Sequence, residues 1–482
     1  MRMLKKTSML WRFPMFCFAA ALCGSGCVAG SSADDGGVTG VNDGTGGASS
    51  GSGGAPSGGS GGAPGAGGMT TTGAGGSNSG AGGAKSGTGG MTTTGAGGAT
   101  NGSGGATTGA GGRTGTGGAT GAGGATAGVG GAPGVGGASG VCTPIASTAT
   151  RPQLTAADAA NDTILKYLAQ TGTLGALTTD NWNPTAGVGN ITSFPADIVV
   201  AMDGSGMFTT VQAGLNAATG TARRYVLVKP GTYREKVTIA TQTPITIYGT
   251  GAATAVTIIN SLDADAAGGT PNTATLMAKN NGFQIANLTI SNDFPTPANP
   301  PSGSSVQAVA LYTTGDKVIL QNVRLHGFQD TLFIDSPSAT TVSRVYIKGS
   351  FIEGDTDFIF GRATAVIDGS TINYLSSRKG TGSGVHMAPS TVVANNFGFL
   401  VTGCNFTSDA TAPANKISLG RSWDQGGVTP TPNGQAVVRE STLGPHINRT
   451  SPWAAAATSS RPFSATGNRF GEYCNTGPGA GP

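Results

Sequence analysis

The spacing of apolar residues changes along the chain and predicts different structure in different regions. Residues 156–170 (AADAANDTILKYLAQ) carry apolar side chains at helical spacing and predict one amphipathic helix. From Ala196 onward, stretches of β-forming residues alternate with Gly, Asn and Asp, which is typical of short strands and turns. These stretches are DIVVAM (197–202), YVLVKPG (225–231), VTIATQTPITIYG (237–249), FQIANLTISND (283–293), VILQNVRLHG (318–327), VYIKGSFIEG (345–354), AVIDGSTIN (365–373), FLVTGCNFT (399–407) and AVVRESTLG (436–444). One stretch, FTTVQAGLNAAT (208–219), instead predicts a helix that caps the N-terminal end of the strands.

The β-rich stretches recur with a loose period. Gly327 and Gly354 are 27 residues apart, and Ser350 and Ser370 are 20 apart. Ser370 and Cys404 are 34 apart. Variable repeats of this length predict an all-β parallel solenoid, in which stacked coils bury apolar residues that no single coil buries alone. Short strands without intervening helices disfavour βαβ architecture, and a β-sandwich is the remaining alternative.

Composition restricts the expected folded part to the region after residue 141. The sequence has 482 residues, of which 86 are Gly. Residues 28–141 are almost wholly Gly, Ala, Ser and Thr, with near-repeats such as GGMTTTGAGG. Such a segment has too little apolar surface to offset chain entropy, so we expect a disordered linker. We expect residues 142–195 to form an N-terminal segment of the folded domain and residues 196–482 to form the solenoid.

The first 27 residues predict an export signal. Basic residues precede the apolar run FCFAAAL (16–22), which is too short to span a bilayer. The next residues, LCGSGC, end at Cys27 and resemble the lipobox of bacterial lipoproteins, although Gly24 occupies the usual leucine position. Two outcomes stay open: lipid anchorage to the outer membrane through Cys27, or plain secretion. In both, the linker would act as a spacer.

Charge and cysteine usage disfavour two classes of protein. Six basic and three acidic residues precede Cys142, which leaves 21 Lys and Arg against 20 Asp and Glu, a net charge of +1. No basic patch with interleaved aromatic residues is present, so nucleic acid is not an expected partner. Cys142, Cys404 and Cys474 lie after the signal region, and this odd number allows at most one disulfide, whose pairing stays open. A structural zinc site is not expected, because the sequence has no Cys-x-x-Cys or Cys/His cluster.

Acidic residues supply the candidate chemistry. In FIEGDTDFIFG, the acids Glu353, Asp355 and Asp357 occupy every second position, which on a strand places them on one face. Asp330, in GFQDTLF, precedes Asp357 by 27 residues, about one coil of the predicted solenoid. Because strands in a sheet stack about 4.8 Å apart, two such carboxyls would repel, which favours one ionised and one protonated group. That combination suits a nucleophile with a general acid.

Amides, an arginine and a tryptophan complete the candidate site. Gln307 in QAVAL and Gln329 in GFQD are uncharged donors, which suit a developing oxyanion. In SLGRSW, Arg421 can pair with an aspartate, and Trp423 offers a flat face to a sugar ring. Taken singly, each residue is more often structural, and an Asp in a solenoid turn is usually a backbone cap. A Ser-His-Asp hydrolase is disfavoured, because no Gly-x-Ser-x-Gly motif occurs in the expected folded part, after residue 141. The three histidines, which we give no role, are His326, His386 and His446.

Together these motifs resemble the signature blocks of pectin methylesterases. QAVAL, GFQDTLF, GDTDFIFG and LGRSW occur in the family's order. PGTYRE (230–235) is similar to the family's Gly-x-Tyr-x-Glu block, and DGSGMFTTVQAGL (203–215) is similar to its N-terminal block. The resemblance covers roughly 196–475 and implies a right-handed parallel β-helix. It also implies hydrolysis of the methyl esters of polygalacturonate (pectin) without a metal or organic cofactor, by a protein that we expect to be a monomer.

The resemblance implies a role for each matching residue. Asp357 would be the nucleophile, held by Arg421, and Asp330 would act as general acid and then as general base. The residues implied to form the oxyanion hole are Gln307 and Gln329, and those implied to contact the galacturonate chain are Trp423, Gln307 and Arg421.

Three features depart from the family pattern. Ser422 replaces the proline of LGRPW, which is expected to loosen a turn without removing Arg421. Arg362 follows FIFG where plant members carry Asn, so we expect a changed charge at the cleft edge. The interval between Asp330 and Asp357 is longer than in plant members and predicts an extended loop around 335–344 that alters the preferred substrate length.

Four other functions stay open. A pectate lyase would need a calcium-binding acid cluster, and a polygalacturonase would need carboxyls spaced around a water. The row at Glu353, Asp355 and Asp357 imitates the former only in part. A related esterase or thioesterase would act on another acyl ester, and a non-catalytic surface β-helix would only bind polysaccharide. We interpret Glu353 and Asp355 as rim or structural groups, redirected by a bend at Gly354 and Thr356.

Overall fold

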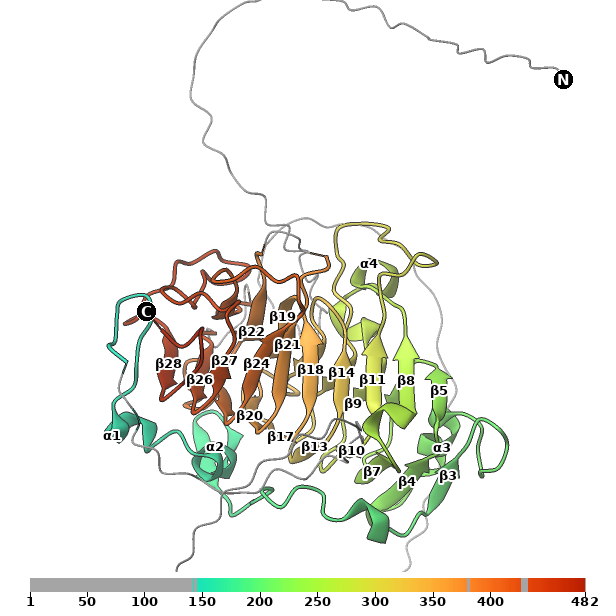
Figure 1. The fold of residues 1–482 in the computed structure, drawn as a ribbon. Helices are drawn as coiled ribbons and strands as arrows, with labels where there is room; N and C mark the ends of the chain where they lie inside the picture. Colours follow the sequence, from blue (N-terminus) through green and yellow to red (C-terminus); the bar gives the residue numbers. More distant parts are fainter. Residues whose placement is uncertain (1–141, 143–144, 379–381, 426–431, 482) are drawn as a thin grey trace, which may run out of the picture. The chain divides into compact units, whose positions relative to one another are not determined.

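The structure, a computed structural model, describes residues 142, 145–378, 382–425 and 432–481. The predicted signal (1–27) and linker (28–141) lie outside the described residues. Within them, most strands belong to three parallel sheets (Figure 1). A smaller sheet is antiparallel. Successive strands along the chain enter the three parallel sheets in rotation, so that a full coil contributes one strand to each. This architecture is a parallel β-helix, and the predicted solenoid is confirmed.

The three parallel sheets differ in length. The ten-stranded sheet contains β3 (Ile198–Val200), β4 (Arg224–Val228), β7 (Ile245–Gly249), β10 (Gln284–Ala286), β13 (Val318–Gln321), β17 (Arg344–Lys348), β20 (Thr364–Asp368), β23 (Phe399–Thr402), β26 (Gln435–Arg439) and β28 (Arg469–Tyr473). The eight-stranded sheet contains β5 (Gly231–Arg234), β8 (Val256–Asn260), β11 (Thr289–Asn292), β14 (Arg324–His326), β18 (Phe351–Gly354), β21 (Thr371–Tyr374), β24 (Asn405–Ser408) and β27 (Thr442–Leu443). The seven-stranded sheet contains β6 (Val237–Ile239), β9 (Leu276–Ala278), β12 (Leu311–Thr313), β15 (Leu332–Ile334), β19 (Thr356–Gly361), β22 (Val385–Pro389) and β25 (Ser418–Gly420).

The sequence repeat corresponds to the stacking of coils. The Ser350 hydroxyl accepts a hydrogen bond from the amide of Val323, 27 residues earlier. The Ser370 hydroxyl accepts from the amide of Ser350, 20 residues earlier, and the Cys404 sulfur accepts from the amide of Ser370, 34 residues earlier. A small polar side chain in each turn therefore holds the adjacent coil, and the predicted spacings are confirmed.

Columns of aliphatic side chains fill the interior. In the ten-stranded sheet, five residues from consecutive coils lie in register and are fully buried: Ile285, Leu320, Ile347, Ile367 and Val401. Burying one such side chain contributes roughly 1.5–3 kcal/mol. Because each member is covered by its neighbours above and below, this stabilisation exists only in the stack.

Helix α3 (Val211–Ala217) covers the interior of the β-helix at its β3 end, as predicted for 208–219. Its Leu215 is buried in the same apolar cluster as the column residues. The Glu235 carboxylate accepts hydrogen bonds from the amides of Val211 and Gln212 at 2.7 and 2.9 Å. Carboxylates stabilise the exposed amides at a helix N-terminus, so this acid of the PGTYRE motif fixes the cap helix.

The prediction of a single helix over 156–170 is wrong. The structure has two short helices there, α1 (Ala156–Ala159) and α2 (Ile164–Ala169). Thr163 between them is extended (φ −114°, ψ 153°), and its hydroxyl accepts from the amide of Lys166 as a new N-cap. A capping threonine thus divides the apolar pattern. The other short helices are α4 (Ala264–Ala267), η1 (Ile191–Ser193), η2 (Ala253–Ala255) and η3 (Thr270–Thr273).

The residues before the β-helix pack on the outside of the ten-stranded sheet. Tyr167 and Leu168 of α2 lie in one apolar cluster with Ile319, Tyr346 and Val366. The hairpin β1 (Gln170–Thr173) and β2 (Ala176–Thr179) forms the antiparallel sheet with β16 (Thr341–Val342). The loop predicted around 335–344 is therefore present and contains a strand that pairs with the N-terminal segment.

A disulfide joins Cys142 to Cys474, across 332 residues of sequence. Cys404 is buried and unpaired, so the odd cysteine count is explained. Among the residues that the structure describes, none of the helices combines the length and the apolar character needed to cross a membrane.

Candidate active site

Asp330 and Asp357 lie on adjacent coils, as predicted. Gln329 forms a parallel bridge with Thr356, and the Asp330 amide donates to the Thr356 carbonyl at 3.1 Å. The strands that follow, β15 and β19, continue this pairing. Each of the two carboxylic side chains belongs to a residue that is only 8% exposed. The coil geometry therefore brings two largely buried acids to matching positions at the edge of the seven-stranded sheet.

The backbone at both acids departs from ordinary strand geometry. Asp330 and Asp357 have positive φ angles of 70° and 48°. The pairing of β19 with β22 changes register between Thr356 and Ile359, which marks a β-bulge at Asp357. Phe358 and Ile359 are both buried in the main core, although adjacent strand residues normally face opposite sides. A bulge re-aims a side chain locally, and here it removes Asp357 from the inward alternation.

Arg421 binds the Asp357 carboxylate with two of its nitrogens. Its Nε donates to Oδ1 at 2.9 Å, and its Nη2 donates to Oδ2 at 2.5 Å. Arg421 follows β25, and its amide donates to the Met387 carbonyl of β22 at 2.9 Å. The planar guanidinium matches a carboxylate in this two-point geometry, which orients the carboxylate. The predicted pairing of Arg421 with an aspartate is confirmed.

The two glutamines come from consecutive coils. The amide of Ala308, next to Gln307, donates to the Gln329 carbonyl at 3.1 Å. Gln307 is 8% exposed, and its carboxamide oxygen is buried without a hydrogen-bond partner among the described residues. Gln329 directly precedes Asp330. The backbone pairing therefore places the two glutamines on the coil of Asp330 and on the coil before it.

Trp423 lies on the outer face of the seven-stranded sheet. Its ring packs against Phe333 and Phe360, with centroid distances of 6.1 and 5.7 Å. Tyr312, Phe333 and Phe360 come from three consecutive coils and stack at 4.6 and 4.2 Å between ring centroids. Aromatic rings and two carboxyls thus share one face of the β-helix, next to the Arg421 side chain.

The row of three acids divides into separate environments. Glu353 ends in the eight-stranded sheet, where it contacts His326 and accepts from Asn373 at 3.3 Å. Asp355 lies in the turn between β18 and β19, where it is fully buried. The expectation that the three acids share one face is therefore wrong, and the bend predicted at Gly354 and Thr356 is confirmed. No group of three or more His, Cys, Asp or Glu in the described part of the chain is arranged to hold a metal ion.

Arg378 is a neighbour of the site that the sequence did not indicate. It donates to both oxygens of Asp355, at 2.7 and 2.9 Å. Its guanidinium lies 4.9 Å from the ring centroid of Phe328, the residue before Gln329. Asp355 thus has a structural partner and supports the coil that carries Gln329. The 23-residue interval between Asp355 and Arg378 matches no motif, because it depends on where the chain turns.

Arg362 is paired within the protein. Its Nε lies 2.7 Å from Asp335 Oδ1, and its Nη2 contacts the Gln425 carboxamide. Burial raises the pKa of Asp335, and the charge of Arg362 opposes that increase. The positive charge expected at the cleft edge therefore has an acidic partner beside it.

Hydrogen bonds hold Ser422 in its turn. The Ser422 hydroxyl donates to Asp424 at 2.7 Å and accepts from the amide of Gly434 at 2.8 Å. Arg461 donates to both oxygens of Asp424, at 2.7 and 2.8 Å. Burial raises the pKa of Asp424, but the hydrogen bonds from Arg461, Ser422 and Ser459 outweigh burial and leave that pKa below its ordinary value. A hydrogen-bonded network therefore replaces the rigid proline next to Arg421.

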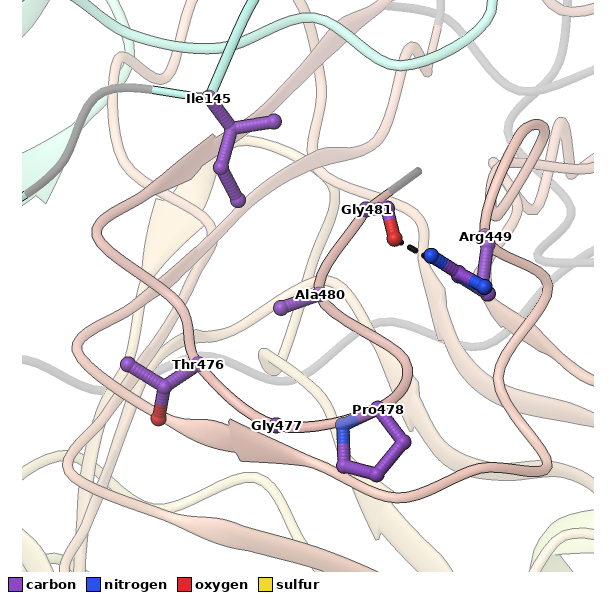
Figure 2. Close-up of a pocket in the computed structure, with 7 residues that line it drawn as sticks. All are labelled: Ile145, Arg449, Thr476, Gly477, Pro478, Ala480 and Gly481. Atoms are coloured by element: carbon purple, nitrogen blue, oxygen red, sulfur yellow. Dashed lines mark hydrogen bonds between the residues drawn. The ribbon is translucent and has the colours of Figure 1, made fainter.

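A concave surface of about 390 Å³ lies away from these residues, where the end of the chain meets the N-terminal segment (Figure 2). Its Arg449 donates from Nε to the Gly481 carbonyl at 2.7 Å. It is lined by Ile145, Arg449, Thr476, Gly477, Pro478, Ala480 and Gly481, none of which is a candidate catalytic residue.

A parallel β-helix that holds two acids, two carboxamides and an arginine at one edge has the parts of a carboxylic ester hydrolase. The family model for pectinesterases matches residues 197–482, and the chain belongs to this family. A pectinesterase of Ralstonia nicotianae is 44% identical over 373 residues, which cover 70% of this chain and 93% of the relative.

Solved structures agree with this assignment. The rice weevil pectin methyl esterase has a TM-score of 0.59 and 31% identity, covering 69% of this chain and 99% of that chain. The Escherichia coli protein YbhC has a TM-score of 0.61 and 30% identity, covering 69% of this chain and 96% of that chain. YbhC carries a different description, "Putative acyl-CoA thioester hydrolase".

Proposed function

We propose that this protein removes methyl groups from esterified polygalacturonate, with Asp357 as the nucleophile. The observation that carries the proposal is the two-point binding of the Asp357 carboxylate by Arg421, with Asp330 at the matching position of the adjacent coil. The names of the pectinesterase relatives supply the substrate class. Together they favour the conversion of a methyl ester to a carboxylate with release of methanol.

In the first half of the reaction, an Asp357 oxygen attacks the ester carbonyl carbon. Negative charge then develops on the carbonyl oxygen, and the carboxamides of Gln307 and Gln329 donate hydrogen bonds to it. The bond to the methoxy oxygen breaks, Asp330 gives its proton to that oxygen, and methanol leaves. The sugar is left bound to Asp357 as an anhydride.

In the second half, Asp330 is ionised and acts as a base. It removes a proton from a water molecule, whose oxygen attacks the sugar carbonyl carbon of the anhydride. The bond to Asp357 breaks, and the carboxylate that returns is bound again by Arg421. The product is a galacturonate carboxyl, and Asp330 holds a proton for the next cycle. Trp423 would support the sugar chain beside the two acids.

Methanol release from highly methylated pectin tests the proposal. Asp357→Asn keeps the side-chain shape but removes the nucleophile, so we expect activity to fall about 1,000-fold or more. Asp203→Asn changes an exposed acid far along the sequence and is the matched control. Full activity of Asp357→Asn, with wild type active, would exclude Asp357 as the nucleophile.

A second candidate function is hydrolysis of another acyl ester or thioester. It is favoured by the similarity to YbhC and its description. The same nucleophile and acid would serve, since only the leaving group changes from methanol to a thiol. Release of free thiol from acyl-CoA by wild type, without methanol release from pectin, would establish this function instead.

We also propose export of the protein, with residues 1–27 as the signal, 28–141 as a linker and 142–482 as the catalytic domain. Lipid attachment at Cys27 would tether the enzyme to the outer membrane, whereas cleavage without lipid would release it. The mass of the mature N-terminal peptide separates the two, because a lipidated Cys27 adds the mass of the acyl chains.

A further inference from the structure

A second groove lies along the edge of the eight-stranded sheet where its strands begin. Asp330 lies at the opposite edge, where they end. The volume of the groove is about 370 Å³, and it follows the turns that lead from the ten-stranded into the eight-stranded sheet. Arg324 opens β14 in this groove, whereas Asp330 follows the end of the same strand. The lining residues are Ala252, Ala253, Thr254, Asn322, Arg324, Gly349, Ser350, Phe351 and Thr371.

Arg324 is held in place there without an anionic partner. Its guanidinium carbon lies 4.1 Å from the ring centroid of Phe351, on the next coil. Its Nε is buried with no hydrogen-bond partner, and the described residues provide it with no ion pair. Stacking on an aromatic ring orients a guanidinium and leaves its donors directed at a ligand in the plane.

Other arginines of the fold have partners. Arg234, on β5 of the same sheet, pairs with Asp293 at 2.8 Å. Arg449, in the surface shown in Figure 2, donates to the Gly481 carbonyl. A guanidinium that is fixed and still has unused donors therefore distinguishes the Arg324 groove from these positions.

The charge around the groove favours an anion. None of its lining residues is acidic, and the hydroxyls of Thr254 and Thr371 add neutral donors. The next outward position of β18 is Glu353, whose carboxylate is already bound by His326 and Asn373. A carboxylate placed beside Arg324 would thus meet donors, while the acid of the same sheet face is engaged by its own contacts.

We propose that this groove binds the carboxylate of a de-esterified galacturonate unit. This inference rests on the proposed function, because that reaction makes carboxylates from neutral esters. Arg324 would pair with the carboxylate, and Phe351 would contact the apolar face of the sugar. A methyl ester has no charge for Arg324, so the groove distinguishes product from substrate. A pectin chain that is already de-esterified would hold the enzyme close to esters that remain.

Binding of unesterified trigalacturonate to the full chain tests the groove. Phe351→Trp, which keeps an aromatic surface under Arg324, serves as a local fluorescence reporter in an Asp357→Asn/Trp423→Phe background, which neither hydrolyses the methylated sugar nor reports from the proposed active site. We expect trigalacturonate to change its emission and fully methylated trigalacturonate to leave it unchanged. Adding Arg324→Gln to the reporter variant is expected to weaken this response at least tenfold, whereas adding Arg234→Gln, the matched paired arginine, is expected to preserve it.

An unchanged response in the Arg324→Gln reporter, or an equal response to the methylated sugar, would overturn the proposal. Circular dichroism melting of each variant shows that the fold is intact. Methanol release from pectin by wild type is measured separately, so failure of the groove and failure of the proposed function give different results: the first removes only the fluorescence response, and the second only the methanol.

Discussion

At the scale of single residues, the site depends on how Arg421 orients Asp357. The two residues are 64 positions apart in sequence and meet because β19, β22 and β25 are neighbours in one sheet. The bulge at Asp357 and its positive φ are sparsely populated geometries for a non-glycine residue, and such geometries collect at functional sites. The carboxylate is therefore aimed by its backbone and fixed by the guanidinium.

Replacing Arg421 by Lys tests the importance of this two-point contact. An ammonium keeps the charge but lacks the planar pair of donors, so the carboxylate would lose its orientation. We expect kcat for methanol release to fall about 10- to 100-fold with a small change in melting temperature. Arg461→Lys is the matched control, because it changes an arginine that binds Asp424 instead. Equal losses in both variants would mean that Arg421 acts only through the local network.

The residues of the candidate site were predictable because each lies in a recognisable motif. Asp330 and Asp357 also had a spacing of one coil, which the structure confirms. The support given by Arg378 to Asp355 was not predictable. Contacts of that kind depend on the length of the turns between coils, and this length varies from one coil to the next without a sequence signal.

At the scale of elements, strand β19 has a glycine where no side chain fits. Gly361 has a φ of 121°, and an added Cβ would lie 2.0 Å from the Ile334 carbonyl oxygen of β15. Gly369, in the turn after β20, also has a positive φ, 55°, but an added Cβ meets nothing within 4 Å. The pair therefore compares a turn position that an alanine can adopt with a strand position that only glycine fits.

We therefore expect Gly361→Ala to destabilise the protein far more than Gly369→Ala. A left-handed alanine costs roughly 1–2 kcal/mol, which is the expected effect at Gly369. At Gly361 the clash forces β15 and β19 apart as well, which adds several kcal/mol because packed interiors do not absorb such shifts. Urea unfolding of both variants measures the difference. Similar midpoints would show that the strands separate without cost.

Most strands were predictable from their apolar alternation, whereas the helix at 156–170 was not. Strand stretches such as VYIKGSFIEG hold two strands with a turn between them, β17 and β18, and the small residues mark the turn. In the helical stretch, the pattern continued past Thr163, but the threonine hydroxyl capped a new helix. A capping residue competes locally with helix continuation, and apolar periodicity does not register it.

The N-terminal segment is attached to the β-helix through Arg344 of β17. The Arg344 guanidinium is 1% exposed and donates to Asp180 at 2.6 Å, to Asp316 at 2.7 Å and to the Leu168 carbonyl at 2.8 Å. Hydrogen bonding by Arg344 holds the pKa of Asp180 well below its ordinary value. One buried cation thus joins α2, the segment after β2 and the ten-stranded sheet.

Arg344→Met is expected to loosen this attachment. It removes the buried cation from both acids, of which Asp180 keeps Lys317 at 3.0 Å, and breaking a buried pair typically costs about 3–5 kcal/mol. Protease cleavage between residues 145 and 195 should become faster, with less effect on the later coils. Arg224→Met removes a more exposed pair with Asp197 and is the control. Unchanged cleavage in Arg344→Met would show that the apolar contacts of α2 suffice.

At the scale of the whole molecule, the stack of coils buries polar groups as well as apolar columns. The spacing of 20–34 residues indicated the stacking, but it did not reveal which side chains would meet inside. His386 and His446 are 0% and 1% exposed, and their Nε2 atoms are 3.3 Å apart. His386 Nδ1 donates to the Ser418 carbonyl at 2.8 Å, so its neutral Nε2 accepts from His446.

This histidine pair should make global stability depend on pH. Burial, together with the charge of His446, lowers the pKa of His386 to about 3, and burial lowers the pKa of His446 to about 4. In the unfolded chain both have pKa values near 6.5, so between pH 6.5 and pH 4 the unfolded state binds more protons. The free energy of unfolding is therefore not reduced by these histidines above pH 6.5. It declines as the pH falls below that value, by about 2 kcal/mol per imidazole at pH 5.

Replacing the pair by apolar residues isolates this effect. In His386→Met/His446→Leu, the free energy of unfolding from urea titrations should change less between pH 7 and pH 5 than in wild type, by roughly 4 kcal/mol. The absolute stability of the variant does not enter, because only its pH slope is compared. Phe399→Leu changes a fully buried core residue that does not titrate and should keep the wild-type slope. A variant slope equal to that of wild type would mean that the two imidazoles bind protons equally in the folded and unfolded states, so that their burial does not couple stability to pH.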